Sequence, residues 1–301
     1  MRLDDQRESG NFQDDTGRSG QGFGGGGGIG GGALGLIFQL VASKFGIVGI
    51  IILALGYCAL SSMGGLGGGG GLIPGAPTAS SAPAGQSNLD PNTKQFLTRV
   101  LGSTEDTWTK IFAASGKQYQ PTTLYAYSGS GQSGCGAAQS AMGPFYCPTD
   151  KKIYLDPTFF NELSQRFQAP GDFAMAYVIA HEVGHHIQGE LGLLDRARNA
   201  QARSSSVEGN KVQVGVELQA DCYAGVWAKT ARDSKGQSIM EADDLAEGLT
   251  AAQAIGDDTL QKQSQGRVVP DSFTHGSAAQ RMAALRRGYD SGDPGQCNFT
   301  S

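Results

Sequence analysis

One long apolar stretch, at residues 34–63, restricts the architectures open to this chain more than any other feature. Its densest part, residues 45–60, is rich in isoleucine and leucine. The whole stretch is long enough to cross a bilayer core of about 30 Å. Glycine tracts lie on both sides of it. We therefore expect a disordered Gly-rich tail at residues 1–33, a transmembrane helix at 34–63, a flexible Gly/Pro/Ser stalk at 64–88 and a folded domain at 89–301.

The positive charges around the apolar stretch predict its orientation. Arg2, Arg7 and Arg18 precede it and Lys44 lies near its start, whereas the next basic residue is Lys94. Positively charged residues favour the cytoplasmic side, so we expect a single-pass cell-membrane protein with a cytoplasmic N-terminus. The domain would then be periplasmic or extracellular. A cleaved signal peptide is less favoured, because the apolar run begins only after more than thirty polar and glycine-rich residues.

Four cysteines lie in the expected domain, and a fifth, Cys58, lies in the apolar stretch. Sequence alone allows three pairings of four cysteines. We favour Cys135 with Cys147 and Cys222 with Cys297, because the first pair closes a short Gly-rich loop. Disulfides need an oxidising compartment, which agrees with a domain outside the cytoplasm. The alternative is that these cysteines are buried and reduced.

Composition and periodicity predict the class of the domain. A little over 200 residues follow the stalk, enough to bury a sizeable core. A net charge of −5 without a basic stripe argues against nucleic acid as a partner. The sequence indicates no particular oligomeric state. Apolar periodicity predicts a helix-dominated α+β domain with a small early sheet. Its helices are expected at 91–101, 105–114, 157–167, 172–189, 214–231, 241–263 and 277–289, and its strands at 122–127, 145–147 and 152–155.

The expected helix at 172–189 contains the motif HExxH as His181, Glu182 and His185. Residues four apart on a helix share a face, so both imidazoles can bind one Zn²⁺. Glu182 lies beside them, where it can take a proton from a water activated by the metal. Short motifs of this kind also occur by chance, so the assignment depends on finding further ligands.

A hydrolytic zinc site usually has three protein ligands and one open position. Glu217 and Asp221, one turn apart on the next long helix, supply a fitting pair. Glu217 is the candidate third ligand. Asp221 can accept the free ring N–H of a ligand histidine and so fix its tautomer. The alternative, a solvated acidic pair, is disfavoured by the apolar residues around them.

The remaining candidates lie near the last helix. His275 directly precedes a helix that Ser277 can cap, and a helix N-terminus favours neutral imidazole. From there His275 could donate a hydrogen bond to the oxyanion of a tetrahedral intermediate. Arg281, one turn into the helix, could pair with Glu217, Asp221 or the substrate. The alternative for His275 is a structural loop histidine.

Two other groups of residues receive no role in catalysis. His186 is expected to face away from the metal, because adjacent helical residues do not share a face. Asp257 and Asp258 are expected to lie in a solvated turn.

Beyond these residues, the chain resembles the bacterial, membrane-anchored neutral zinc metallopeptidase family over essentially its whole length. The family takes its name from the HExxH motif, so the resemblance implies peptidase-like chemistry without naming a substrate. The segments that carry it are Met1, Arg2, Arg7, Glu8, Ser9 and Asn11, CG and SAMGPFYCP within 135–148, IYLD at 153–156, HEVGHH at 181–186, ELQADCYAGVW at 217–227 and FTHGSAAQR at 273–281.

A more distant resemblance concerns the order of the motifs. HExxH, then Glu-x-x-x-Asp, then Thr-His-x-Ser with a following arginine is similar to the gluzincin membrane peptidases related to CAAX-processing proteases. This resemblance implies a zincin-like fold, Glu217 as third ligand and a site role for His275 and Arg281. Those relatives often have several spans, whereas the one expected span here argues against intramembrane substrates.

The sequence therefore predicts a metallopeptidase with one Zn²⁺ per chain and Glu182 as general base. His275 and Arg281 would steady the oxyanion, and a peptide would lie along an edge strand at 153–156. One alternative is a non-catalytic, zinc-stabilised scaffold or sensor domain with a fourth protein ligand. Another is a deformylase-like amidase in which a cysteine replaces the glutamate. Cys222, next to Asp221, is the candidate ligand in both.

Overall fold

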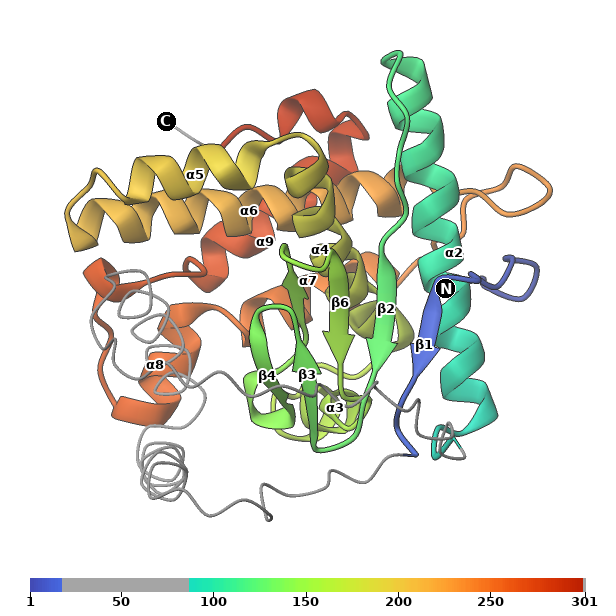
Figure 1. Cartoon of the computed structure of the whole chain (residues 1–301), viewed down its shortest axis with the longest axis horizontal. Coiled ribbons are helices and arrows are strands. Elements are labelled where there is room, and N and C mark those ends of the chain that lie inside the picture. Colours follow the sequence, from blue (N-terminus) through green and yellow to red (C-terminus); the bar gives the residue numbers. More distant parts are fainter. Residues whose placement is uncertain (18–86, 300–301) are drawn as a thin grey trace, which may run out of the picture.

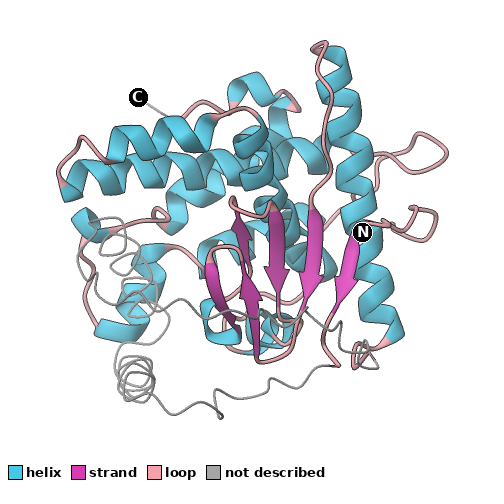
Figure 2. Ribbon diagram, in the orientation of Figure 1, coloured by secondary structure: helices cyan, strands magenta, loops and turns pink. Residues whose placement is uncertain are grey.

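The computed structural model describes residues 1–17 and 87–299, and helices form most of this part of the chain (Figure 2). The helices, labelled in Figure 1, are α2 Pro91–Ala114, α3 Phe159–Gln165, α4 Asp172–Glu190, α5 Leu193–Gln201, α6 Ser206–Thr230, α7 Asp244–Ala254, α8 Asp257–Gln265 and α9 Ala278–Ser291. The strands are β1 Phe12–Asp14, β2 Thr123–Ala126, β3 Ser130–Ser133, β4 Gly136–Gln139, β5 Phe145–Cys147 and β6 Lys152–Leu155. Short 3₁₀ turns lie at Ser140–Met142, Pro270–Ser272 and Pro294–Gln296. The predicted helix-dominated α+β class with a small early sheet is confirmed.

The larger sheet has four strands in the order β1-β2-β6-β5. β1, β2 and β6 are parallel, and β5 runs antiparallel to β6. Side chains alternate between the two faces of a strand. Leu124 and Ile153 join the main core under the helices, whereas Tyr154 joins a small second cluster with Tyr127 and Cys147. The sheet is therefore covered by helices on one face and by a separate layer on the other.

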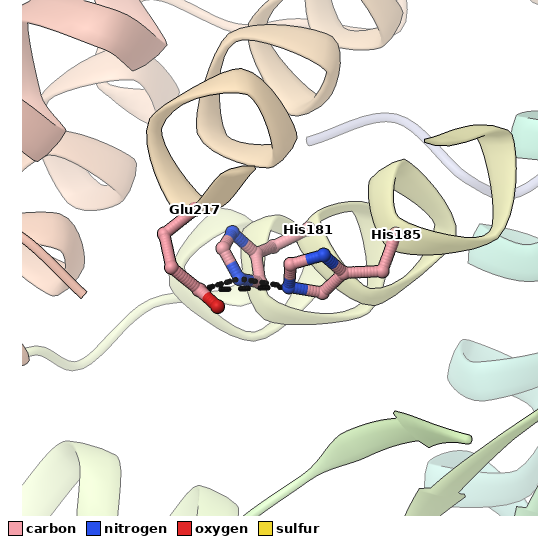
Figure 3. A group of neighbouring side chains, drawn as sticks. All are labelled: His181, His185 and Glu217. Atoms are coloured by element: carbon pink, nitrogen blue, oxygen red, sulfur yellow. Dashed lines mark hydrogen bonds and ion pairs between the residues drawn. The ribbon is translucent and has the colours of Figure 1, made fainter. Parts of the chain in front are cut away.

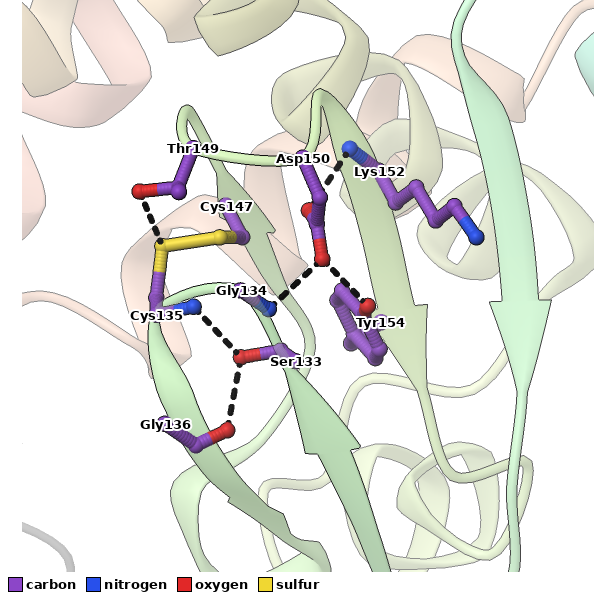
Figure 4. The surroundings of a disulfide bond; sticks show 9 residues. All are labelled: Ser133, Gly134, Cys135, Gly136, Cys147, Thr149, Asp150, Lys152 and Tyr154. Atoms are coloured by element: carbon purple, nitrogen blue, oxygen red, sulfur yellow. Dashed lines mark hydrogen bonds between the residues drawn. A yellow bond between two sulfur atoms is a disulfide. The ribbon is translucent and has the colours of Figure 1, made fainter. Parts of the chain in front are cut away.

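That other layer is the β3–β4 hairpin, which forms between the expected strands at 122–127 and 145–147, where no strand was predicted. A disulfide joins Cys135, at the turn of the hairpin, to Cys147 at the end of β5 (Figure 4). Asp150 accepts the Gly134 N–H at 2.7 Å and the Tyr154 hydroxyl at 2.6 Å. Both residues of the hairpin's turn are thus tied to the β5–β6 pair. The second disulfide joins Cys222 and Cys297, so both predicted pairings are confirmed.

Helix α6 crosses α4 and α9 closely, and these crossings assemble the residues of interest. A Cβ atom at Gly184, in the middle of the HExxH motif, would lie 2.9 Å from the Cα and carbonyl oxygen of Ala220. A Cβ at Gly288 would lie 1.9 Å from the carbonyl oxygen of Cys222. Only glycine permits backbones to approach this closely.

The first 17 residues are an integral part of the fold, so the expected disorder of residues 1–33 is wrong for this part. β1 pairs with β2 at the edge of the sheet, as the blue strand in Figure 1 shows. Leu3 is buried in the main core, and Ser9 donates to the buried Glu105 carboxylate at 2.6 Å. The Asn88 backbone N–H and side-chain amide donate to the hydroxyl and carbonyl oxygens of Thr16, each at 3.1 Å. Residues 18–33 lie outside the described part of the chain.

The expected transmembrane helix at 34–63 and most of the stalk also lie outside the described residues. Within 1–17 and 87–299, no helix is long and apolar enough to cross a membrane. The contact between Thr16 and Asn88 brings together the two points where the chain leaves and re-enters the described structure. A single crossing between them would place these contacting residues on opposite sides of a membrane. The predicted cytoplasmic N-terminus with an outside domain is therefore incompatible with this packing.

Several helices differ from expectation, and tertiary contacts account for two of the differences. The two helices expected at 91–101 and 105–114 are one helix, α2, in which the Ser103 hydroxyl accepts a hydrogen bond from the Trp227 indole. The helix expected at 241–263 is divided into α7 and α8, because the Asp257 N–H donates instead to the Gly276 carbonyl at 2.9 Å. α5 was not expected, and α6 begins eight residues before the expected 214.

Candidate metal centre

Helices α4 and α6 bring the three predicted ligands to one point (Figure 3). His181 Nε2 lies 3.2 Å from His185 Nε2 and 3.3 Å from Glu217 Oε2, and His185 Nε2 lies 3.5 Å from that oxygen. A tetrahedral zinc ion with bonds of about 2.0–2.1 Å separates its ligand atoms by about 3.3–3.4 Å. The three side chains therefore have the spacing and chemistry of a zinc site.

The ligands line a cavity of about 460 Å³. Glu182 also lines it and is buried, adjacent in sequence to His181 on α4. The rest of the lining is largely apolar, with Phe145, Phe159 and Val178 among its residues. A carboxylate beside a metal site can exchange protons with a bound water.

Asp221 supports His181 through a buried network. Its carboxylate accepts hydrogen bonds from His181 Nδ1 at 2.7 Å and from the Tyr177 hydroxyl at 2.6 Å. The Arg281 guanidinium donates to the same carboxylate through Nε and Nη2, each at 2.9 Å. Burial would raise the pKa of Asp221, but Arg281 and His181 lower it to about 2, so the group is ionised. The sequence left three partners open for Arg281, and in the structure its guanidinium pairs with Asp221.

His185 has a different support, which the sequence did not reveal. Its Nδ1 lies 2.9 Å from Oε1 of Gln188, three residues further along α4. Gln188 is fully buried and its amide donates to the Val216 carbonyl at 2.7 Å. A backbone carbonyl can only accept, so the amide nitrogen must face Val216 and the amide oxygen must face His185. His185 therefore carries its proton on Nδ1 and directs the Nε2 lone pair toward the other ligands.

Glu217 is held from the opposite side by Gln213. The Gln213 amide donates to Glu217 Oε1 at 2.9 Å, which leaves Oε2 facing the histidines, and Gln201 of α5 donates to Gln213 Oε1 at 2.9 Å. Burial opposes ionisation of Glu217, but the neighbouring histidines hold its pKa well below the usual range. Burial would likewise lower the pKa of His181, yet Asp221 and Glu217 raise it to about 10. The buried carboxylates thus favour positive charge on the neighbouring imidazoles.

Another acidic group satisfies the geometric requirements for a metal, formed by Asp172, Asp244 and Glu247. The Met1 ammonium lies 2.7 Å from the Asp172 carboxylate and 3.2 Å from that of Asp244. This group therefore already has a cation from the chain, the Met1 ammonium.

His275 reaches the cavity, and Asp257 orients it. Asp257 is buried, contrary to the expected solvated turn, and its Oδ2 accepts the backbone N–H groups of Thr274, His275 and Gly276 at 2.7–3.1 Å. Its Oδ1 lies 3.3 Å from His275 Nδ1. Burial lowers the pKa of His275, but Asp257 and Glu217 raise it above the ordinary value. The Asp257 carboxylate therefore opposes the preference for neutral imidazole that the helix N-terminus alone would give. Asp258 caps α9 by accepting the Ala278 N–H at 2.7 Å.

His186 faces away from the metal site, as expected. Its Nε2 donates to the Gln120 carbonyl at 2.6 Å, and its Nδ1 lies 3.2 Å from the Tyr146 hydroxyl. Burial lowers the pKa of His186. This histidine therefore ties α4 to β5, whose Tyr146 lines the cavity.

Two sequence-based interpretations of the site are corrected. Cys222 is bonded to Cys297, so it is not a metal ligand and the cysteine-ligand alternatives lose their candidate. The strand at 153–156 is not an edge strand, because β6 pairs with β2 on one side and β5 on the other. The edge strand beside the cavity is β5, which contributes Phe145 and Tyr146 to the lining.

Two histidines from HExxH on α4 and a glutamate from α6, beside an apolar cavity, define a candidate zinc hydrolase of helix-dominated α+β fold. Comparison with known proteins agrees. The family described as "Putative neutral zinc metallopeptidase" matches residues 1–300, so the chain belongs to this family.

Similar proteins extend along most of the chain. It is 44% identical to "Uncharacterized protein YpfJ" of Escherichia coli K12 over 302 aligned positions, covering 99% of this chain and 98% of that protein. It is also 44% identical to "Uncharacterized protein Rv2575" of Mycobacterium tuberculosis over 191 positions, covering 61% of this chain and 64% of that protein. No solved structure matches the chain.

Proposed function

We propose that this protein is a zinc-dependent metallopeptidase that hydrolyses peptide bonds with Glu182 as general base. The observation that carries the proposal is the spacing of 3.2–3.5 Å among the ligand atoms of His181, His185 and Glu217. Glu182 lines the same cavity. Membership of the family agrees with this chemistry.

A zinc ion supplies Lewis-acid chemistry, which lowers the pKa of water and polarises a carbonyl group. The protein contributes the proton transfers. Glu182 is the one carboxylate of the HExxH motif, and it is buried in the cavity wall beside the ligands. It takes a proton from the attacking water and later delivers that proton to the leaving amine. Such positioned acid–base catalysis contributes about 10²–10⁴-fold to a rate.

His275 stabilises the negative charge that develops on the carbonyl oxygen. The Asp257 carboxylate favours the imidazolium form, which carries a proton on each nitrogen. Nδ1 can then donate to Asp257 while Nε2 donates to the oxyanion. Arg281 acts differently from the initial hypothesis: it positions Asp221, and Asp221 positions His181.

The substrate peptide lies extended along β5. This strand ends the described sheet on the side of the cavity, and an edge strand presents unpaired N–H and C=O groups to an added strand. His186 holds Tyr146 of β5 against α4, so the strand that would bind the peptide is held next to the helix that carries the HExxH motif.

The protein functions in an oxidising compartment. The two disulfides support this location, because such bonds persist outside the reducing cytosol. Residues 1–17 lie in the same compartment as residues 87–299, since they share one sheet and one core.

Replacing Glu182 by glutamine tests the proposed chemistry. The variant should bind zinc as the wild type does and lose about 10²–10⁴-fold in cleavage rate, because glutamine cannot take the proton. Zinc content by mass spectrometry and a proteomic comparison of terminal peptides provide the measurements. Glu190→Gln, on the same helix but paired with Lys151 outside the cavity, is the matched control.

The result separates the two remaining hypotheses. A catalytic protein gives new peptide termini in the wild type and the Glu190→Gln variant but not in Glu182→Gln. A scaffold or sensor domain gives the same termini and the same cellular effects in all three, and that outcome would overturn the proposal.

A further inference from the structure

A chain of buried hydrogen bonds connects the C-terminal disulfide to the metal ligand His185. Gln188, which faces His185 Nδ1, also donates through Nε2 to Gln219 Oε1 at 3.0 Å. Gln219 in turn donates through its own Nε2 to the Cys297 carbonyl at 2.7 Å. Cys297 is held by its disulfide to Cys222 on α6. The path from the disulfide to the ligand therefore has three links.

The polarity of this chain is set by backbone atoms at two points. The Cys297 carbonyl can only accept, so Gln219 must direct its amide nitrogen toward Cys297 and its oxygen toward Gln188. The Val216 carbonyl imposes the same orientation on Gln188 independently. Both glutamines and the two cysteines are at most 7% exposed, so water does not readily replace these partners.

Without the Cys297 carbonyl, Gln219 loses the backbone acceptor that orients its side-chain amide. Gln219 could then rotate its amide, and Gln188 would retain only the Val216 carbonyl to orient it. The residues around Cys297 follow the end of α9 and include only a short 3₁₀ turn, so the disulfide is the covalent tie that keeps this carbonyl in place. The other disulfide joins a hairpin to β5 and has no hydrogen-bonded path of this kind to a ligand in the described part of the chain.

We propose that Gln188 and Gln219 are positioning residues for His185 and that the Cys222–Cys297 disulfide maintains zinc affinity by anchoring them. This inference rests on the proposed zinc site. It assigns to this disulfide a role at the metal, in addition to the stability that any disulfide closing a 75-residue separation provides.

The test compares zinc affinity in variants of the full chain by competition with a chromophoric chelator. Gln219→Leu retains both disulfides and should weaken zinc binding about tenfold, the lower end for residues that support a ligand. Cys222→Ser with Cys297→Ser should weaken it by a similar factor. The absorption spectrum of the Co²⁺-substituted protein should change in both, because the geometry at His185 changes.

Two matched controls separate this role from general destabilisation. Cys135→Ser with Cys147→Ser removes the other disulfide and should leave zinc affinity unchanged. Gln6→Leu removes another buried amide that donates to a backbone carbonyl, that of Arg232, and should also leave it unchanged. Thermal unfolding of each metal-free variant records its stability separately.

The outcomes are distinguishable. Weaker zinc binding and an altered cobalt spectrum in Gln219→Leu, with both controls unaffected, support the inference. Wild-type affinity in Gln219→Leu, or an equal loss in the Cys135→Ser/Cys147→Ser control, overturns it. A wild-type protein that binds no zinc would instead overturn the proposed function. Wild-type affinity in the Cys222→Ser/Cys297→Ser variant overturns the role of the disulfide. If that variant does not fold, Gln219→Leu still decides the role of the two glutamines, because it keeps every covalent tie.

Discussion

His181 and His185 lie one turn apart on α4 and have equivalent places in the proposed site, yet their Nδ1 atoms have different kinds of hydrogen-bond partner. His181 faces the ionised Asp221, which is itself paired with the buried Arg281. His185 faces the neutral amide of Gln188, which continues through Gln219 to the C-terminal segment. One support is a charged cluster, and the other is a chain of neutral groups.

The difference has consequences for what each support can tolerate. A buried ion pair cannot lose one member without leaving an uncompensated charge. A neutral amide chain loses only hydrogen bonds when one member is removed, and each has a modest net free energy. We therefore expect the charged residues that support His181 to determine whether the protein folds. The neutral amides that support His185 should instead determine how tightly the protein binds metal.

Replacing Asp221 by leucine should have the largest effect. Arg281 is only 3% exposed and would keep a buried charge without its carboxylate partner. The free energy of unfolding should fall by about 3–5 kcal/mol, measured by denaturant titration. Adding Arg281→Met should restore most of this loss, because the ion pair is then replaced by apolar groups. Zinc affinity should stay about 10–100-fold weaker in the double variant, since His181 has no acceptor. Recovery of both properties would contradict the role of Asp221 at His181.

Replacing Gly184 by alanine should affect both supports at once, because this residue sets the distance between α4 and α6. The added Cβ would lie 2.9 Å from backbone atoms of Ala220. Separation of the helices should lower the free energy of unfolding by about 1–3 kcal/mol and also weaken zinc binding. Gly209→Ala is the control, since its nearest atom lies 4.0 Å away. It should be neutral or stabilising by up to about 1 kcal/mol. Equal free energies of unfolding for Gly184→Ala and Gly209→Ala would contradict the close approach of α4 and α6 at Gly184.

Replacing Gln188 by leucine should have the smallest effect on folding. The variant loses neutral hydrogen bonds to His185, Val216 and Gln219, so the free energy of unfolding should fall by about 1–2 kcal/mol. Zinc affinity should fall about tenfold or more. Calorimetric zinc titration and thermal unfolding measure the two quantities. A loss of stability as large as that of Asp221→Leu would remove the distinction between the supports.

The sequence predicted those parts of the site that follow from helical spacing. His181 and His185 are four residues apart, as are Glu217 and Asp221, and such pairs share a helix face in any fold. Gln188 gave no such signal, because a neutral amide three residues from a histidine is unremarkable in a helix. Asp257 was missed for another reason. Its role depends on the start of α8 lying next to the loop that leads into α9, and no local sequence pattern predicts that these two segments meet.

The N-terminal segment shows the same limit at the level of the fold. Residues 1–17 are polar and short of periodic apolar residues, so they indicated disorder. They are ordered because β1 pairs with β2, more than 100 residues away, and because Glu105 accepts hydrogen bonds from Ser9 and Asn11. This packing also changes the expected membrane topology, which was derived from charges along the chain alone.

By itself, the sequence indicated the candidate chemistry of this protein: which residues can bind a metal and which carboxylate can act as a base. Those properties depend on residue type and on separations of a few residues, where helix geometry fixes the outcome. Only the tertiary structure decided how each candidate ligand is held, which strand forms the edge beside the cavity, and that Thr16 contacts Asn88. Those properties arise from contacts between residues far apart in the chain, and short-range patterns carry no information about them.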